Sequence, residues 1–171
     1  MGMRTRSLSL LLGAALASAA SVHSAPPDTR VLRSWQEPVT KGETVVLHRV
    51  EAVFDYRQGQ AFERVLAPDG TVLELRPMQR VPTPSEPEIA DAVAIVRGDT
   101  GFQRLIDGRD ALLEGGFVLA EPSGEPCGPP ARCLQIFAFD DAEGVTLGRA
   151  VVDISGGAVV RIDDFSEGGL P

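Results

Sequence analysis

Three stretches decide the fold of this 171-residue chain: EIADAVAIVRG at 88–98, GFVLAEPSGE at 116–125 and CLQIFAFDDAEGVTLGRAVVDISGGAVVRIDD at 133–164. The first has the apolar spacing of an amphipathic helix, and the other two have the alternation of half-buried strands. We therefore predict an α+β fold in which one main helix packs on an antiparallel sheet and a β meander precedes the helix.

The helix carries local signals at both ends. Ser85 can cap its start, and Glu88, three residues later, completes a capping box. Gly98 stands where a left-handed residue would end the helix. The apolar stripe consists of Ile89, Val93 and Val96. These signals predict a helix over 86–97, with a further helical turn in 101–107.

Turn residues divide the rest of the chain into strands. Before the helix, strands are predicted over 44–56, 61–66 and 72–76; after it, over 111–120, 134–139, 146–154 and 158–162. The predicted organisation is a signal peptide over 1–24, an irregular N-terminal arm over 25–42, a single α+β domain over 43–165 and a tail over 166–171. Within the domain, the meander spans 43–77, and the helix with four strands spans 85–165.

Two segments of the chain, 50–76 and 134–162, resemble each other in sequence. A Phe-Asp pair, a glycine and an arginine recur at a constant offset of 85: Phe54-Asp55, Gly59 and Arg64 match Phe139-Asp140, Gly144 and Arg149. The resemblance reflects either an internal duplication or two hairpins with the same turn chemistry, since hairpin glycines recur for steric reasons.

Residues 1–24 have the parts of a secretory signal. Arg4 and Arg6 precede an apolar run over 8–20, and small residues follow it. Cleavage after Ser24 is favoured, and a cut near Ala19 or Ala20 is the alternative. The run is shorter than the roughly 20 residues that cross a bilayer as a helix. We predict a periplasmic or secreted protein that has no membrane attachment after cleavage.

The charge of the chain excludes several classes of partner. The formal net charge is −8, and removal of Arg4 and Arg6 with the signal makes it −10. Phosphate backbones and anionic membrane surfaces repel so acidic a chain, and the sequence shows no basic patch. We therefore expect no nucleic-acid partner and no peripheral membrane binding.

Cys127 and Cys133 are the only cysteines of the chain. In an oxidising compartment they predict a disulfide that closes a short loop. A redox or metal pair is the alternative, but the spacing is not Cys-x-x-Cys and no histidine is near in sequence. Closing so short a loop stabilises a fold by about 2 kcal/mol, because the gain grows with loop length.

Two surfaces are candidates for partner binding. The loop around the cysteines contains Pro126, Pro129 and Pro130, whose rigidity reduces the entropy lost on binding. Trp35 is the second candidate. Its side chain is either buried against the sheet as part of the core, or exposed on the N-terminal arm as an anchor for a partner protein.

The sequence predicts no catalytic residue, no metal site and no cofactor. His48 lies in an apolar strand, and the chain has no Gly-x-Ser-x-Gly context for a nucleophile. The carboxylates of Asp140, Asp141 and Glu143 lack the alternating spacing of a calcium loop, so we interpret them as a solvated hairpin turn. The carboxylates of Asp163, Asp164 and Glu167 form a second acidic cluster near the end of the chain.

The order of helix, strand, Glu-Pro corner and paired hairpins resembles the noncatalytic, cystatin-like N-terminal domains of copper amine oxidases. Three segments carry this resemblance: EIADAVAIVRG, FVLAEPSGE and AFDDAEGVTLGRAVVDISGGAVVRI. A peptidase-propeptide-like module of the PepSY type shares the closing strand, glycine and strand, and it is the nearest competitor. Either resemblance implies a helix packed on antiparallel strands.

The same resemblance implies that the chain has no amine oxidase activity of its own. The chemistry of that family uses three copper-binding histidines and a tyrosine in an Asn-Tyr-Asp or Asn-Tyr-Glu motif. Once His23 is removed with the signal, only His48 remains, and the neighbours of Tyr56 do not match the motif. We expect a noncatalytic binding or accessory module whose partner is an exported protein. A periplasmic small-ligand carrier, with its ligand between helix and sheet, is the alternative, and a hydrolase built on His48 is less favoured.

Overall fold

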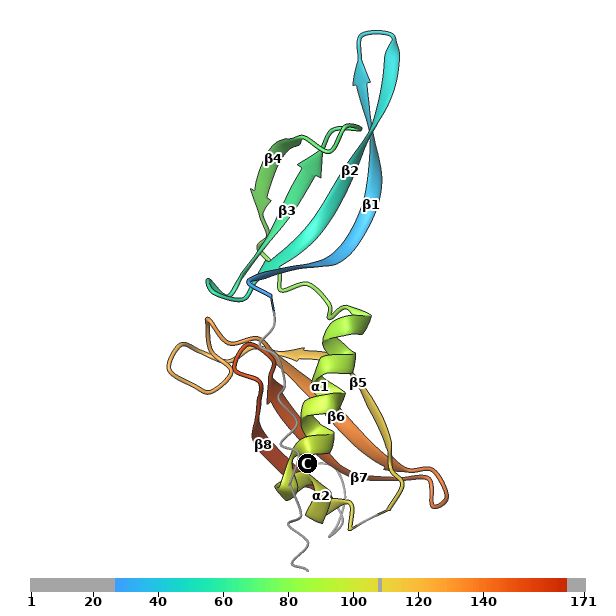
Figure 1. Cartoon of the computed structure of the whole chain (residues 1–171), viewed down its shortest axis with the longest axis vertical. Helices are drawn as coiled ribbons and strands as arrows, with labels where there is room; N and C mark the ends of the chain where they lie inside the picture. The colour runs from blue at the N-terminus through green and yellow to red at the C-terminus, as the bar shows by residue number, and fades with distance from the viewer. Residues whose placement is uncertain (1–26, 108, 166–171) are drawn as a thin grey trace, which may run out of the picture.

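The chain forms two four-stranded antiparallel sheets and two helices in a computed structural model that describes residues 27–107 and 109–165 (Figure 1). The first sheet contains, in order, β1 (Thr29–Lys41), β2 (Thr44–Asp55), β3 (Gln60–Leu66) and β4 (Val72–Pro77). The second sheet contains β5 (Leu112–Leu119), β6 (Cys133–Asp140), β7 (Val145–Asp153) and β8 (Ala158–Asp164). The helices are α1 (Glu86–Gly98) and α2 (Thr100–Leu105). The predicted α+β class is confirmed at this level, whereas the predicted signal peptide over 1–24 and tail over 166–171 lie outside the described residues.

The prediction of an irregular arm over 25–42 is wrong for residues 29–41. These residues form β1, which pairs with β2 from Thr29 opposite Asp55 to Lys41 opposite Thr44. β1 lies at the edge of the first sheet, where Pro38 is tolerated because an edge residue can do without one ladder hydrogen bond. The residues of β1 are all exposed or half-buried, so the strand lacks the strong apolar alternation that predicts strands.

α1 begins as predicted but ends differently. The hydroxyl of Ser85 accepts a hydrogen bond from the backbone N–H of Glu88, and the Glu88 carboxylate accepts one from the backbone N–H of Ser85. The predicted left-handed cap at Gly98 is wrong, because Gly98 ends α1 without a positive φ. The chain leaves the helix through the extended residue Asp99, whose side chain caps α2 by accepting from the N–H of Phe102 at 2.8 Å.

The main core lies between α1, α2 and one face of the second sheet. The helices pack on β5 to β8, and Figure 1 shows the first sheet beyond the N-terminal end of α1. The largest part of this core consists of Ala92, Val96, Phe102, Leu134, Ile136, Ala138, Ala150 and Val152. Among the described residues, no helix packs on the first sheet in the same way.

The two sheets have the same strand order and the same central turn. After β2, the Asp55 side chain accepts from two following backbone N–H groups, and Gly59 has a φ of 64°. After β6, Asp140 accepts from two following backbone N–H groups in the same way, and Gly144 has a φ of 67°. Each glycine donates its N–H to the carbonyl of its aspartate at 2.8 Å. The sequence similarity between 50–76 and 134–162 is thus matched by strand order and turn geometry.

These two glycines give a test of how the sheets meet. Alanine at either position is strained by about 1 kcal/mol, because both residues are left-handed. A Cβ at Gly59 would also overlap the backbone of Pro130, whereas nothing lies within 4 Å of a Cβ at Gly144. We expect Gly144→Ala to lower the free energy of unfolding by about 1 kcal/mol, and Gly59→Ala by a further 1–3 kcal/mol or so, in urea unfolding. Equal losses would show that Pro130 does not constrain this turn.

Candidate functional site

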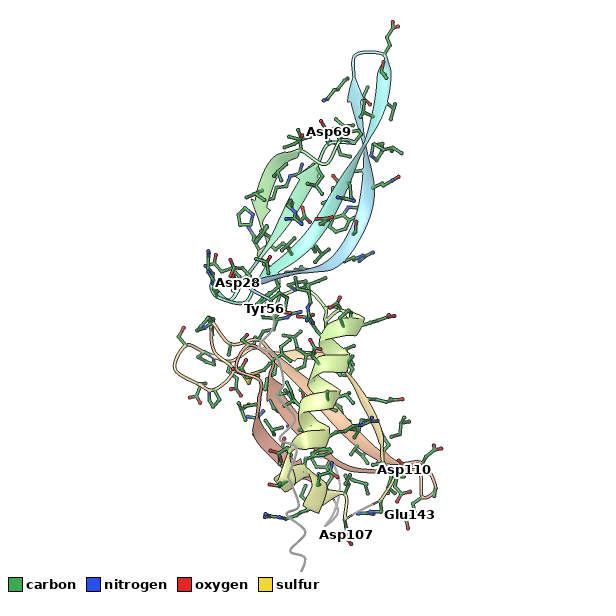
Figure 2. All side chains as sticks on the ribbon, viewed as in Figure 1. Asp28, Tyr56, Asp69, Asp107, Asp110 and Glu143 are labelled. Carbon is green, nitrogen blue, oxygen red and sulfur yellow. A yellow bond between two sulfur atoms is a disulfide. The ribbon has the colours of Figure 1, made fainter. Side chains whose placement is uncertain are left out.

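A buried ion-pair network joins the two sheets at the start of α1. Arg132, which precedes β6, donates from Nε to Glu88 Oε1 at 2.5 Å and from Nη2 to Oε2 at 3.0 Å. Tyr56, directly after β2, donates its hydroxyl to Glu88 Oε1 at 2.6 Å, and Figure 2 shows Tyr56 where the two sheets meet. The side chains of Arg132 and Glu88 are both 0% exposed. One carboxylate therefore connects the end of β2, the start of α1 and the loop before β6.

Further contacts surround this network. The Arg132 guanidinium lies 4.5 Å from the centroid of the Phe54 ring, and its Nη2 donates to the carbonyl of Pro82 at 3.3 Å. Arg30, on β1, pairs with Asp91 of α1 at 2.7 Å. Both oxygens of Glu88 accept more than one hydrogen bond, from Arg132, Tyr56 and Ser85. Because these partners fill its acceptor sites, the carboxylate is suited to hold the structure together rather than to act as a general base.

The network shifts the pKa values of two groups. Burial opposes ionisation of Glu88, but hydrogen bonds and the charge of Arg132, with further bonds from Tyr56 and Ser85, lower its pKa below the ordinary carboxylate value. Burial raises the pKa of Tyr56 well above its ordinary value, and the hydrogen bond to Glu88 and its negative charge raise it further. At neutral pH the network therefore holds an ionised Glu88 and a neutral Tyr56.

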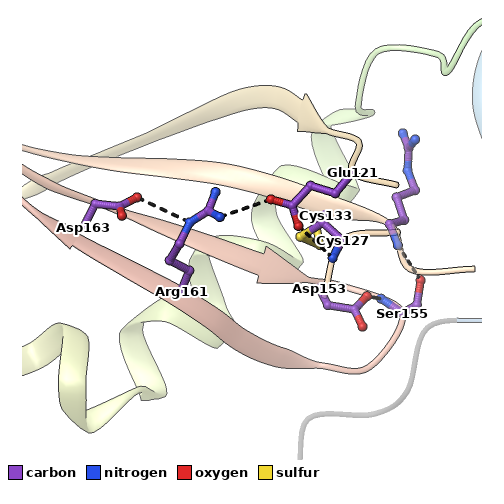
Figure 3. Close-up of a disulfide and its surroundings, with 8 residues drawn as sticks. Glu121, Cys127, Cys133, Asp153, Ser155, Arg161 and Asp163 are labelled. Carbon is purple, nitrogen blue, oxygen red and sulfur yellow. Dashed lines mark hydrogen bonds and ion pairs between the residues drawn. A yellow bond between two sulfur atoms is a disulfide. The ribbon is translucent and has the colours of Figure 1, made fainter. Parts of the chain in front are cut away.

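The predicted disulfide between Cys127 and Cys133 is confirmed, with a Cα–Cα distance of 5.6 Å. It is buried and packs on Leu119 and Val151. Figure 3 shows it beside Glu121, whose carboxylate accepts from the Cys127 N–H at 3.2 Å and binds Arg161 at 3.1 Å. Because Arg132 immediately precedes Cys133, the disulfide also fixes the loop that carries this arginine into the junction. The three prolines of the loop are exposed: Pro126, Pro129 and Pro130.

The second sheet carries an aromatic cluster on the face opposite α1. The ring of Phe137 contacts Phe117 edge to face at 6.4 Å and stacks with Phe139 at 6.3 Å. Phe117 is 65% exposed, and Leu112, which pairs with Phe139, is 49% exposed. We call these four residues the aromatic face. Hydrogen-bonded polar side chains border it: Gln135, Arg149 and Asp163.

The first sheet also has an uncovered apolar face. By the ladder register, five large side chains that are 41–61% exposed lie on it, and we call it the open face: Val31, Val45, Leu47, Val72 and Leu75. At its centre, Glu51 binds Arg64 at 2.6 Å and Arg49 at 3.1 Å. A hollow of about 800 Å³ lies at the end of this face, between β2 and the turn that contains Asp69. Figure 2 labels Asp69 in this turn.

The structure places Trp35 differently from both predictions. It is a half-buried residue of β1, so it is neither a core plug nor an anchor on a flexible arm. Its Nε1 donates to Glu37 at 3.0 Å, and the Arg33 guanidinium lies 5.9 Å from its ring centroid. It pairs with Val50, on the side of the first sheet opposite the open face.

The remaining sequence candidates have structural positions. His48 is 6% exposed on β2, opposite Glu37, and no described serine hydrogen-bonds to it. The interpretation of Asp140 as a turn residue is confirmed by its hydrogen bonds to the β6–β7 turn. Within residues 27–107 and 109–165, no group of three or more His, Cys, Asp or Glu side chains is placed to hold a metal ion.

The chain matches no protein-family model, and no curated protein sequence is significantly similar to it. In the part of the chain that the structure describes, no helix is long and apolar enough to span a membrane. The resemblance to amine oxidase N-terminal domains therefore stays a prediction.

Replacing Glu88 tests the junction. Glu88→Gln leaves Arg132 as a buried, uncompensated charge, so we expect the free energy of unfolding to fall by about 3–5 kcal/mol. Glu86→Gln, at an exposed position of the same helical turn, should change it by less than about 0.5 kcal/mol. The lowered pKa of Glu88 stabilises the fold above a pH of about 4.3, and this contribution is lost as the pH falls below it, so the two variants should converge in acid. Similar small losses at neutral pH would contradict a buried pair.

Tyr56 reports on the same junction at alkaline pH. It is the only tyrosine of the chain, so the tyrosinate absorbance belongs to it alone. Because folding raises its pKa, the stabilisation by neutral Tyr56 is complete below a pH of about 10 and is lost as the pH rises further. We expect the phenol of Tyr56 to titrate well above a pH of about 10 in the folded chain and close to a pH of about 10 in the urea-unfolded chain. Tyr56→Phe should lose stability less steeply in this range. Titration of the folded chain at the ordinary tyrosine pKa would contradict the burial.

Proposed function

We propose that this chain is an exported, noncatalytic binding protein that recognises another exported protein through its aromatic face. The observation that carries the proposal is the cluster of Phe117, Phe137 and Phe139 on a sheet face that no described helix covers, with Phe117 65% exposed. Exposed apolar clusters mark interaction sites, and aromatic side chains dominate the energetics of protein interfaces.

The surroundings of the aromatic face favour binding because they order it in advance. The opposite side of the sheet is packed against α1 and α2, and the disulfide lies at one end of β6. These constraints order the face before binding, so little conformational entropy is lost when a partner docks. Polar, hydrogen-bonded side chains surround the apolar centre, as in protein–protein interfaces.

The finer architecture forms part of the same proposal. We propose that α1 and the second sheet are a cystatin-like unit without amine oxidase activity of its own, and a helix lying across four antiparallel strands supports this. The cross-linked cysteines support an oxidising, exported location.

A small-ligand carrier is the second candidate. The space between α1 and the second sheet is filled by core side chains, so the observation that favours a carrier is the hollow on the open face.

A capture experiment separates these functions. The mature chain, residues 25–171, is immobilised and exposed to exported proteins of its own source, and bound proteins and extracted small molecules are identified by mass spectrometry. We expect a stoichiometric protein partner whose binding weakens at least about tenfold in Phe117→Asp, a loss typical of an interface hot spot. Val81→Asp is the matched control, because Val81 is 54% exposed in the connector after β4.

Two results would contradict the proposal. If Phe117→Asp retained the partner as well as the unmodified chain does, the aromatic face would not be part of the interface. A bound small molecule without any protein partner would contradict the protein-binding proposal and support the small-ligand carrier.

A further inference from the structure

The open face of the first sheet corresponds to the helix-covered face of the second sheet. The two central turns align the strands that precede them, β2 with β6. Three residues of β6 lie beneath α1 and are 0% exposed, and at the offset of 85 they correspond to three residues of β2: Leu134, Ile136 and Ala138 to Arg49, Glu51 and Val53. No described helix covers this face of the first sheet, where the Arg49 side chain is 57% exposed, although Glu51 is only 7% and Val53 1% exposed.

We propose that the open face binds an acidic amphipathic helix of a partner protein, in the place that α1 occupies on the second sheet. This inference rests on the proposed function of the chain as a binding protein, and it adds a second surface and the kind of segment that this surface recognises. Helices dock into apolar grooves through side chains spaced three or four residues apart. Leu47, Val45 and Leu75 supply the apolar surface for such contacts.

The charges of the open face favour an acidic segment. Two arginines, Arg49 and Arg64, share the single carboxylate of Glu51, so the centre of the face has one excess positive charge in a chain whose net charge is −8. The Arg49 side chain is 57% exposed and contacts Glu51 through Nε, which leaves its outer nitrogens to bind a carboxylate from a partner. Asp69, which lines the far end of the hollow, is the one acidic residue there.

The same charges argue against a second copy of this chain as the occupant. A twofold dimer formed through the open face would bring two copies of the same positively charged centre together. Like charges facing each other across an interface oppose association. A helix with an apolar stripe can pack on the exposed Val and Leu side chains of the open face, and a carboxylate on the same helix can pair with Arg49.

Site-specific photocrosslinking in cells of the chain's own source tests the proposal. Benzoylphenylalanine replaces, in separate full-length chains, Leu47 on the open face, Phe117 on the aromatic face and Val81 in the connector. We expect crosslinks from position 47 to map to an acidic amphipathic helix of a different protein, and none from position 81. Crosslinks from position 47 to a second copy, to an extended segment or to lipid would overturn the inference.

The three positions also separate the two proposals. Protein crosslinks from position 117 without any from position 47 would overturn the open-face inference and leave the proposed function intact. Absence of protein crosslinks at both positions would overturn both.

Charge reversal adds a second readout. Arg49→Glu should lower the crosslink yield from position 47 at least about tenfold, in line with the loss of a charge-assisted contact. Replacing the facing acidic residue of the identified segment by lysine should restore it. This rescue distinguishes recognition from misfolding, and an unchanged yield in Arg49→Glu would overturn the charge argument.

Discussion

The placement of the two sheets depends on one buried carboxylate, Glu88. A buried ion pair stabilises a fold only when hydrogen bonds replace the water that both ions lose. Glu88 accepts hydrogen bonds from three parts of the chain: Ser85 at the helix start, Tyr56 after β2 and Arg132 before β6. Arg132 also donates to the carbonyl of Pro82, although its Nη1 has no partner among the described residues. Among these donors Tyr56 directly follows β2, so its bond to Glu88 ties the end of that strand to the start of α1.

The disulfide has a larger effect on geometry than its small loop suggests. Cys127 and Cys133 are six residues apart, and so short a loop contributes about 2 kcal/mol by restricting the unfolded chain. The same loop, however, carries Arg132 into the junction and places Pro130 against the turn at Gly59. The disulfide therefore helps to determine how the two sheets meet, although each sheet has its own hydrogen-bonded ladder.

The sequence predicted those parts of the structure that depend on local chemistry. The strands β2 to β8, the capping box at Ser85 and the disulfide follow from alternation, turn residues and short spacings. β1 was missed because an edge strand needs no buried stripe and tolerates Pro38. Glu88 was recognised as a capping residue, but its pairing with Arg132 spans 44 residues and has no local signal. The aromatic face was missed because Phe117, Phe137 and Phe139 meet only when β5 pairs with β6.

The two sheets differ in the residues that they place on the face that α1 covers in the second sheet. Leu134, Ile136 and Ala138 are apolar because α1 always covers them, so they never meet water in the folded chain. The corresponding residues of β2 include Arg49 and Glu51; the Glu51 carboxylate is buried and pairs with Arg49, whose side chain is 57% exposed, so a charged group and not an apolar one meets water there. A face that a helix always covered would be apolar throughout, and a face that only met water would be polar throughout. The open face has both charged residues and exposed Val and Leu side chains. This mixture of charged and exposed apolar side chains is what the proposed recognition by the open face requires, while Phe54 and Tyr56 of the same part of the chain pack into the core of the second sheet.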